Sequence, residues 1–519
     1  MQYKPMRLPC HPVHLVADAL ALALVAGLPL FMPNGYVELI GYKFSLLLRC
    51  VLVALLLLPF ACLWKNRCKT ALRRFSFAWL WPVGLCLCYA AAWFFVEDRF
   101  TALWGLSGRN NGLVLYLACT AAYLLIAVAG SPGIVPLARR TFTATGCVVT
   151  VISWLNYWMI DPLDAYYTFL PDRGELFLGT VGNINFYGAF LCLCVPLAAE
   201  TYFRQRGRLL DKSYWVTLFL CSGLIPAGSD ASWLGCFAAL LALCCTRKTT
   251  TQTLARAAAL CAGVAAVALG TGGVAKLIPA RVELRTVSAQ LASPLVGGIL
   301  LVAVALTAYA LGKTRPRPAA GAVRAFSLVL LAAAVGALVL ANLWPGGPQP
   351  LAALRFTERW ASNRGYAWQK LWTIYTQDTT LLQKLIGLGG DAVKARLNPD
   401  IESTRYMVLL NGEAFDSAHN EFLQHLVCGG ALGLLCWCGF CAAALVRGFR
   451  NCPALAAAML GYLVQSFFSI SMPGVLPLVF VLAALAETTP APRTENNGIR
   501  LAAGGTLLFA AAFSLLVIP

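Results

Sequence analysis

Charged residues are scarce in this 519-residue chain, and hydrophobic residues make up most of it. Asp, Glu, Lys and Arg together reach 12%, hydrophobic residues reach 59%, and the mean hydropathy is +0.72. Soluble domains carry about 25% charged residues, so this composition excludes an ordinary soluble protein. Apolar runs long enough to cross about 30 Å of hydrocarbon recur along the whole chain. The sequence therefore predicts an all-α, polytopic bundle of membrane helices.

The apolar runs predict about 13–15 transmembrane helices, because those near 233 and 475 are short for a span. The first run lacks a clear small-residue cleavage site, so we interpret it as a span and not as a signal peptide. We expect a bundle of about 11 spans at 1–345, a large loop at 346–419 and C-terminal helices at 420–519. The runs lie near 14–32, 45–64, 76–96, 112–130, 141–160, 184–203, 213–229, 233–246, 255–275, 291–312, 325–345, 420–446, 454–470, 475–487 and 501–518.

Acidic residues are also few, since 22 Asp and Glu stand against 40 Lys and Arg, and the formal net charge is +18. By the positive-inside rule, the alternate basic loops and the N-terminus are cytoplasmic and the loop 346–419 is extracytoplasmic. One loop breaks the pattern, because Lys276, Arg281 and Arg285 fall outside on this count. We interpret the basic excess as a topological signal and expect no nucleic-acid partner. The basic loops are 65–74, 139–140, 204–212, 247–256, 313–324, 447–450 and 493–500.

The 20 cysteines lie mostly within the apolar runs, and none falls in a predicted external loop. Disulfides form in oxidising compartments, so this placement does not indicate a disulfide scaffold. Cys438 and Cys441 form a C-x-x-C pair with no second pair to complete a metal site. We interpret the cysteines as small buried hydrophobic residues.

Only four histidines occur, and His419 lies in the polar stretch 416–424 that opens a strongly hydrophobic run. On the predicted topology this imidazole lies at the outer boundary of the membrane. There it could handle a proton on a substrate whose lipid tail stays in the bilayer. The alternative is that His419 only caps or anchors the helix, with Asp416 or Ser417 as the N-cap.

The loop 346–419 is the only long hydrophilic stretch of the chain. Its aromatic and leucine residues recur at helical spacing, which predicts a helix that lies on the bilayer surface or caps the bundle. Gly387 and the pair at 389–390 are expected to end that helix. The residues with this spacing are Trp368, Leu371, Trp372, Tyr375 and Leu382.

Three polar motifs, at 107–112, 182–188 and 229–235, stand where predicted external loops become membrane helices. A helix N-terminus presents free amide donors and a partial positive charge, which favour an anionic group.

Two segments resemble signatures of a known family. Arg364-Gly-Tyr-Ala-Trp368, followed by Ile386-Gly-Leu-Gly389, resembles the Arg…Trp…Gly-x-Gly core of the large external loop in O-antigen ligases and related polymerases. His419-Asn420-Glu-Phe-Leu423-Gln, with Gly430 and Gly433 after it, resembles their His-Asn-x-x-Leu-Gln…Gly-x-x-Gly signature. The motifs at 108–112 and 182–186 also look like elements of this family. The resemblance covers about 100–450 and is most specific at 355–435.

The resemblance implies a multi-pass glycosyltransferase of the cytoplasmic membrane. Such proteins take a glycan from an undecaprenyl-diphosphate carrier on the outer face and need no metal or other cofactor. A ligase passes the glycan to a lipid or protein acceptor, whereas a polymerase passes it to another repeat unit. One departure is Asp230, because family ligases commonly carry Arg at this position. The reversed charge leaves open a different substrate or a catalytically degenerate member.

Glycan transfer needs a group that accepts the hydroxyl proton and cations that stabilise the departing diphosphate. Guanidinium groups stay charged and bind phosphate oxygens in pairs. His419 is therefore the candidate general base or positioning group, and Arg364 is its catalytic partner. We expect these two residues and Arg109 to share one cavity. The substrate-binding candidates are Arg109, Arg359, Asn420, Asn183 and Asn185.

Each candidate residue also has a purely structural interpretation. External arginines often extend to lipid headgroups, the asparagines are common at helix starts, and Asp230 fits a helix cap. A transporter or a flippase for lipid-linked glycans is the alternative function, because transporters carry ionisable residues within the membrane. Here Arg49 and Glu200 are the clearest charged residues within predicted spans, and both lie near span ends. Polar residues gather at the external ends, which favours catalysis.

Overall fold

A computed structural model describes residues 12–63, 75–131, 133–167, 171–344, 346–397 and 415–488, and most of these are helical. The N-terminal helices are α1 (Pro12–Leu30), α2 (Leu39–Leu63), α3 (Leu80–Phe95), α4 (Arg99–Trp104), α5 (Leu113–Ala129), α6 (Ile134–Tyr157), α7 (Ile184–Phe203), α8 (Lys212–Ser222), α9 (Leu224–Ala227), α10 (Asp230–Cys244), α11 (Thr251–Val274), α12 (Thr286–Ala292), α13 (Pro294–Lys313) and α14 (Ala320–Leu343). Then follow α15 (Gln349–Ala352), α16 (Trp360–Gln377), α17 (Leu381–Ile386), α18 (Val393–Leu397), α20 (Glu421–Asn451), α21 (Pro453–Ser466) and α22 (Leu476–Glu487). The predicted all-α polytopic fold is confirmed.

Regular strands are short in the described residues. β2 (Phe177–Leu178) pairs antiparallel with β3 (Gly182–Asn183), and β1 (Pro33–Tyr36) precedes α2. Two 3-10 turns, η1 (Phe77–Trp79) and η2 (Pro171–Leu176), complete the elements.

Eight helical segments in the described part of the chain are long and apolar enough to cross a membrane. The shorter apolar helices are α5, α10, α21 and α22. The predicted run at 501–518 lies outside the described residues. The eight segments are Pro12–Leu30, Leu39–Ala61, Phe77–Phe95, Ile184–Phe203, Thr251–Val274, Pro294–Lys313, Ala320–Leu343 and Glu421–Asn451.

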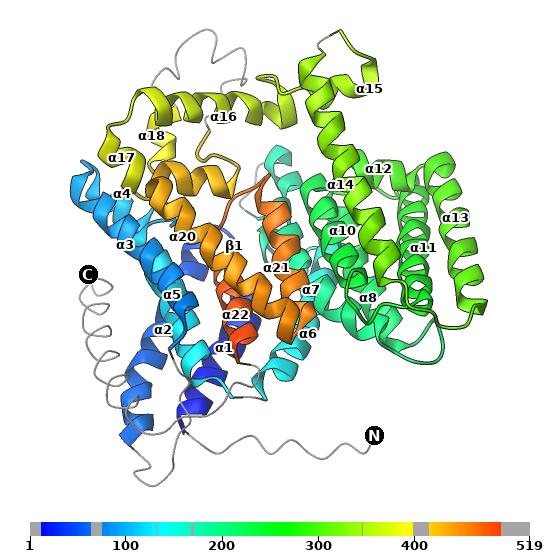
Figure 1. Ribbon diagram of the computed structural model, residues 1–519, viewed down its shortest axis with the longest axis horizontal. Coiled ribbons are helices and arrows are strands. Elements are labelled where there is room, and N and C mark those ends of the chain that lie inside the picture. Colours follow the sequence, from blue (N-terminus) through cyan, green and yellow to red (C-terminus); the bar gives the residue numbers. More distant parts are fainter. Residues whose placement is uncertain are drawn as a thin grey trace.

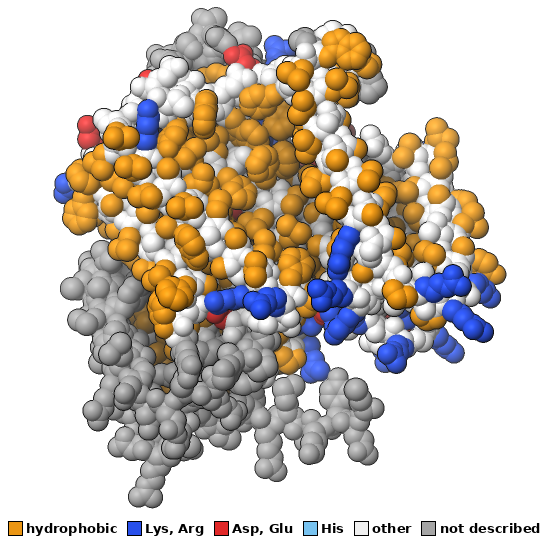
Figure 2. All heavy atoms as spheres, viewed as in Figure 1, with side chains coloured by type: hydrophobic (Ala, Val, Ile, Leu, Met, Phe, Trp, Pro, Cys, Tyr) orange, Lys and Arg blue, Asp and Glu red, His pale blue; other side chains and the backbone are white. Residues whose placement is uncertain are grey.

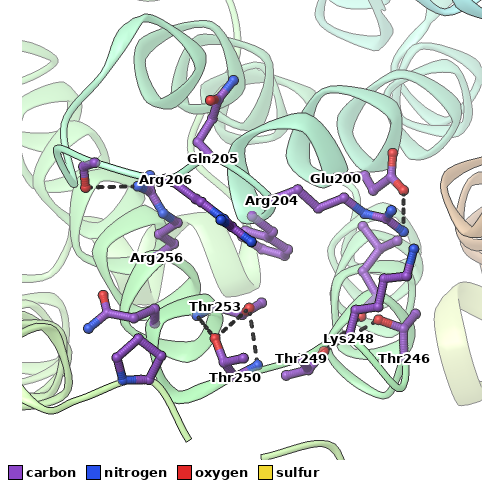
Figure 3. A pocket seen from close by; sticks show the side chains of 15 residues that line it. Glu200, Arg204, Gln205, Arg206, Thr246, Lys248, Thr249, Thr250, Thr253 and Arg256 are labelled. Carbon is purple, nitrogen blue, oxygen red and sulfur yellow. Dashed lines mark hydrogen bonds and ion pairs between the residues drawn. The ribbon is translucent and has the colours of Figure 1, made fainter. Parts of the chain in front are cut away.

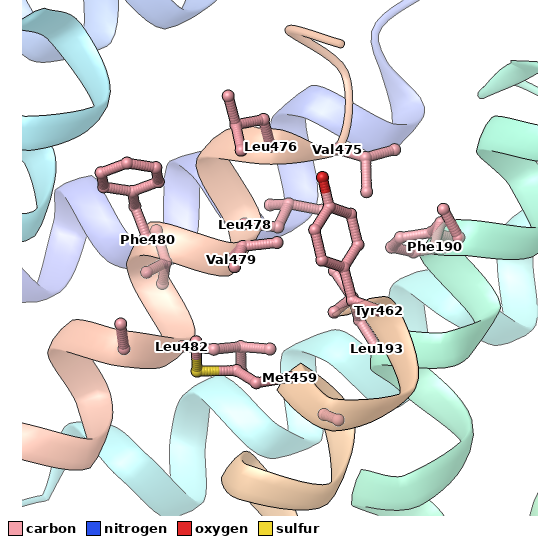
Figure 4. Close-up of a cluster of buried hydrophobic side chains, with 14 of the residues drawn as sticks. Phe190, Leu193, Met459, Tyr462, Val475, Leu476, Leu478, Val479, Phe480 and Leu482 are labelled. Atoms are coloured by element: carbon pink, nitrogen blue, oxygen red, sulfur yellow. The ribbon is translucent and has the colours of Figure 1, made fainter. Parts of the chain in front are cut away.

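The core of the bundle lies where α7, α21 and α22 meet, and Figure 4 shows their side chains converging there. Helices in lipid associate through close packing, which small residues permit. Gly235 of α10 is one such residue, because a Cβ there would lie 2.4 Å from the carbonyl oxygen of Gly461 in α21. The labelled core residues are Phe190, Leu193, Met459, Tyr462, Val475, Leu476, Leu478, Val479, Phe480 and Leu482.

The two peripheral helices α13 and α14 turn their apolar side chains outward. In an apolar 18-residue stretch of each helix, only 11% of α13 and 6% of α14 is buried, whereas 89% of α7 is buried. Figure 2 shows hydrophobic side chains over most of this face. An apolar surface of this extent needs an apolar surrounding, as a bilayer provides.

The two ends of the bundle differ in charge. Helices α15 to α18 lie at one end, and α16 runs across the top of the bundle in Figure 1. Lys and Arg side chains gather along the opposite edge in Figure 2. This segregation fits the alternate basic loops of the sequence, and the absolute orientation remains a prediction from the positive-inside rule.

The longest helix, α20, is broken near its start at Gly430, which has φ 69° and ψ −174°. The break exposes two carbonyls, and the loop after α17 satisfies both of them. The amide of Leu388 donates to the Val427 carbonyl at 2.9 Å, and that of Gly389 donates to the Cys428 carbonyl at 3.0 Å. The break is therefore filled by backbone from the large loop.

The helix predicted to run from the Trp368 region to Gly387 is in fact two helices, and that prediction was wrong. α16 ends at Gln377, and Thr380 starts α17 with a reciprocal capping box to Gln383. This cap is a local signal that overrides the apolar spacing. Leu371 is buried whereas Trp372 is 57% exposed, so the predicted face is divided between the bundle and its surroundings.

We predict that Gly430→Ala destabilises the protein. A Cβ at Gly430 would lie 2.3 Å from the Leu385 carbonyl oxygen, and its backbone conformation costs a non-glycine residue about 1–3 kcal/mol. The apparent melting temperature of the purified protein in detergent should fall. Gly433→Ala is the matched control, because its Cβ would have no neighbour closer than 3.6 Å. Equal melting temperatures for both variants would contradict the assigned role of the break.

Candidate functional site

The candidate site is a charged cluster at the start of α20, at the end of the bundle where α16 lies. Arg109 forms an ion pair with Asp416 through Nη2 and Oδ1. The same carboxylate oxygen lies 3.9 Å from Nε2 of His419. The side chain of Arg109 is 12% exposed, that of His419 32% and that of Asp416 42%. Two of the sequence candidates, far apart in the chain, therefore meet at one carboxylate.

The segment before α20 holds the imidazole in place from several directions. Asn420 is the N-cap, since its side-chain oxygen accepts from the Leu423 amide at 3.0 Å. The Ala418 carbonyl accepts a hydrogen bond from Trp368 Nε1 at 2.9 Å, and the Ala418 amide donates one to Gln424 Oε1 at 3.0 Å. His419 itself has φ 45°, which is rare for a residue other than glycine. The backbone on both sides of His419 is thus fixed by hydrogen bonds.

The suggested N-cap at Asp416 or Ser417 was wrong, because Asn420 caps the helix. The side-chain oxygen of Asn420 is committed to that cap, and the residue is buried. Its predicted role in substrate binding therefore rests on its side-chain amide group.

Arg364 stands at the start of the regular part of α16. The three residues before it, Ala361 to Asn363, have positive φ and form a left-handed turn. Gly365 permits this turn, because a Cβ there would lie 1.8 Å from the Thr357 carbonyl oxygen. Nη1 of Arg364 donates to the Ala361 carbonyl at 3.2 Å, while its buried Nε has no acceptor among the described residues. Burial lowers the pKa of Arg364, which stays charged because guanidinium is a very weak acid.

The turn that carries Arg109 is fastened to the large loop by Asp391. A carboxylate oxygen of Asp391 accepts from the Leu106 amide at 2.9 Å and from the Asn111 amide at 3.1 Å. Amides near the start of α5 therefore bind an anion, as the motif indicated, but the anion is an aspartate of the protein. The buried Nε of Arg109 has no acceptor within the described ranges.

A cavity of about 370 Å³ adjoins this cluster. Arg109 and Lys394 contribute positive charge to its lining, whereas Asp416 and Glu38 contribute negative charge. The cavity itself is therefore balanced in charge, and Arg364 supplies the excess cation nearby. Asn183 also lines it.

The expectation that Arg109, Arg364 and His419 line one cavity is met only for Arg109. His419 adjoins the cavity through Asp416, and Arg364 is close enough for its charge to act on the imidazole.

The local charges set the protonation of the cluster. Burial and the cations of Arg364 and Arg109 together lower the pKa of His419 to about 4, and Asp416 opposes this shift. Burial raises the pKa of Asp416, but its pairing with Arg109 outweighs this and the net shift is downward. At neutral pH the site therefore holds a neutral imidazole beside an ionised carboxylate and two guanidinium ions.

The other predicted residues have different surroundings. Arg359 occupies the exposed N-cap position of α16 and is not among the residues that line the cavity. Asn183 caps α7 by accepting from the Asn185 amide at 2.9 Å. Asn185 accepts from the Ser229 hydroxyl at 2.9 Å, so it joins α7 to the turn before α10. These asparagines therefore have structural bonds, and only Asn183 also reaches the cavity.

Asp230 is exposed, and it accepts from the Thr286 hydroxyl and from the Val287 amide at 3.3 Å. The N-cap of α10 is Ser229, so Asp230 does not cap its own helix and instead bonds to the first turn of α12.

Sequence reasoning missed Asp391 and Lys394. Asp391 directly follows the glycines at 389–390, and an acidic residue after such a turn was a usable signal. Asp416 was quoted with its motif but not selected as a site residue. Within the described residues, no group of three or more His, Cys, Asp or Glu side chains could hold a metal ion. The 17 cysteines of the described ranges are free.

Comparison with known proteins gives one result. The family model described as O-antigen ligase matches residues 288–438, which run from α12 into α20 and contain Arg364, Asp391, Asp416 and His419. A search of curated proteins gives no match.

We predict that Arg364→Gln raises the pKa of His419 from about 4 toward the ordinary value near 6.5, because a cation that disfavours the imidazolium is removed. At pH 5 the neutral fraction of His419 should then fall. Its modification by diethyl pyrocarbonate, which attacks neutral imidazole, should slow when followed by peptide mass spectrometry. Arg359→Gln is the matched control and should leave the rate unchanged. No difference between the two variants would show that Arg364 does not act on His419.

Proposed function

We propose that this chain, which matches the O-antigen ligase family model over residues 288–438, transfers a glycan from a lipid-diphosphate carrier to an acceptor hydroxyl. The donor expected from the family is an undecaprenyl-diphosphate-linked glycan on the outer face of the cytoplasmic membrane. The acceptor is a lipid, a protein or another repeat unit. The reaction requires no metal or other cofactor in this proposal.

One observation carries the proposal. A neutral imidazole, His419, stands beside the Asp416–Arg109 ion pair and under the influence of the Arg364 charge. Both guanidinium groups keep a buried Nε donor without an acceptor in the described part of the chain. Buried donors of this kind are normally paired, so they suit an anionic ligand with several oxygens.

The transfer balances with these groups alone. The acceptor oxygen forms its bond to the anomeric carbon while its proton passes to the free nitrogen of His419. The bond from the anomeric carbon to the diphosphate oxygen breaks, and its electron pair stays on the diphosphate. Arg364 and Arg109 stabilise that charge. Because the pKa of His419 is about 4, the imidazolium passes its proton on readily, and Asp416 is the nearest anion that favours its formation.

The contributions have ordinary magnitudes. General-base assistance is worth about 10²–10⁴ in rate. A donor that stabilises developing negative charge is worth about 10²–10³. A base with a low pKa lies at the lower end of the first range, so most of the acceleration is assigned to the two arginines and to positioning.

The buried charges within the spans do not favour transport. Besides Arg49 and Glu200, the candidate spans contain the buried charged residues Asp18, Lys43, Arg256 and Glu421. Lys43 donates to the carbonyls of Leu28 and Pro29, Asp18 accepts from the Ser131 amide at 2.9 Å, and Arg256 donates to the carbonyls of Gly207 and Arg208. These three are thus bonded to backbone, and Glu421 accepts from the Tyr462 hydroxyl, whereas transport sites use such groups for the substrate.

We predict that His419→Ala and Arg364→Ala each reduce glycan transfer at least about 100-fold, because each removes a group used in the transition state. Transfer should be measured with purified protein and a lipid-diphosphate glycan, after equal amounts in the membrane are verified. Arg396→Ala is the control, since this exposed residue of α18 is not part of the cluster or of the cavity lining. Products at the level of the control from both variants would end the catalytic assignment.

The orientation can be tested independently. Gln369→Cys lies at an exposed position of α16, and Arg315→Cys lies at an exposed position of the α13–α14 connector. A membrane-impermeant maleimide added to intact cells should label the first variant above the level of the parent protein. The second variant should be labelled only after permeabilisation. The reverse pattern would put the candidate site on the cytosolic face and refute the proposed reaction at the outer face.

A further inference from the structure

A second cavity, of about 710 Å³, lies at the basic end of the bundle. Three connectors enclose it, namely those between α7 and α8, between α10 and α11, and between α13 and α14. On the predicted topology these connectors are cytoplasmic, so the cavity is at the opposite end of the bundle from His419. Neither the proposed transfer nor any motif of the sequence uses it.

The lining of this cavity is strongly cationic. Arg204, Arg206, Lys248 and Arg256 line it together with a single carboxylate, Glu200. Glu200 is already engaged, because Arg139 lies 2.6 Å and Arg204 lies 2.7 Å from its oxygens. Arg206 and Lys248 are exposed and form no ion pair within the described ranges. The cavity therefore has positive charge that no acidic residue offsets.

Arg256 is a fixed and buried cation in this lining. Its residue is 3% exposed, and its Nη2 donates to the carbonyls of Gly207 and Arg208, both at 3.1 Å. Its guanidinium carbon lies 5.1 Å from the centre of the Tyr202 ring. Nη1 has no hydrogen-bond acceptor among the described residues, and its nearest carboxylate oxygen, on Asp211, is 3.7 Å away. This buried donor thus lacks a hydrogen bond, although its charge is paired with that of Asp211.

The N-terminus of α11 adds partial positive charge to the cavity. Thr250 caps this 24-residue helix and forms a capping box with Thr253, and both threonines line the cavity. Figure 3 shows them across the open space from the arginines of the α7–α8 connector. A helix N-terminus carries partial positive charge, so it favours an anion at the same place as the cations.

Hydrogen bonds between two connectors and the start of α11 hold the wall of the cavity together. The amide of Thr251 donates to the Arg317 carbonyl at 3.0 Å, and the amide of Ala319 donates to the Thr249 carbonyl at 3.0 Å. Gln252 Nε2 donates to the Thr314 carbonyl at 2.9 Å. These bonds hold the α13–α14 connector against the start of α11, so this wall of the cavity is formed before any ligand arrives.

We propose that this cavity binds a phosphate-bearing anion at the basic face of the membrane, through Arg206, Lys248, Arg256 and the N-terminus of α11. Phosphate oxygens match both the guanidinium donors and the helix N-terminus. The anion is either the headgroup of an acidic phospholipid or a soluble phosphate compound. The site is separate from the one that holds the diphosphate in the proposed transfer.

The test compares two double variants of the full-length protein in detergent. Arg206→Gln with Lys248→Gln removes two cations of the lining, whereas Arg208→Gln with Arg247→Gln removes two exposed cations outside it. The net charge changes equally. Native mass spectrometry measures retention of phosphatidylglycerol against phosphatidylcholine, and equilibrium dialysis measures binding of glycerol phosphate. Size-exclusion profiles verify that both variants are folded.

We expect the lining variant to lose about tenfold or more in affinity for at least one probe while the control stays close to wild type. Loss for phosphatidylglycerol identifies a lipid headgroup as the source. Loss for glycerol phosphate alone identifies a soluble compound. Equal affinities of the two double variants for both probes, whether both high or both low, would overturn the proposal.

Discussion

The candidate site depends on how the broken start of α20 satisfies its backbone. A carbonyl without a partner is costly in a membrane, and the break at Gly430 frees those of Val427 and Cys428. The amides of Leu388 and Gly389 fill both positions. This backbone contact docks the loop 387–391 onto the same helix whose start carries His419. The geometry of the large loop and that of the imidazole are therefore linked by main-chain hydrogen bonds. Side-chain substitutions elsewhere in the loop leave these bonds in place.

Asp391 extends this linkage to a third segment. Its carboxylate binds the amides at 106 and 111, so the turn with Arg109 is held against the docked loop. Arg109 can then pair with Asp416, just before α20. The protein supplies its own anion to the helix start, which leaves the arginine side chains, not the amides, as the donors for a ligand.

The helical membrane fold and the motifs at 364, 387–389 and 419 were readable from the sequence, because apolar length and glycine spacing are local signals. The family match at 288–438 supports that interpretation. The pairing of Arg109 with Asp416 and the bond between Asn185 and Ser229 were not readable. They depend on which helices pack together, and single-sequence spacing does not carry that information. The cap at Asn420 is a local bond to the amide of Leu423, in keeping with the common use of asparagine at helix starts. The division between α16 and α17 was visible as a capping box but was outweighed by the aromatic spacing.

Helix α7 connects the two ends of the molecule. Asn183, its N-cap, lines the cavity beside Arg109, while Glu200 and Phe203 in its last turn line the basic one. A helix of 20 residues is about 30 Å long, and α7 is the most enclosed of the long apolar helices. Pro196 lies inside this helix, so one of its backbone hydrogen bonds is missing between the two cavities. Because residues of one helix line both cavities, a substitution that moves α7 would change the lining of both.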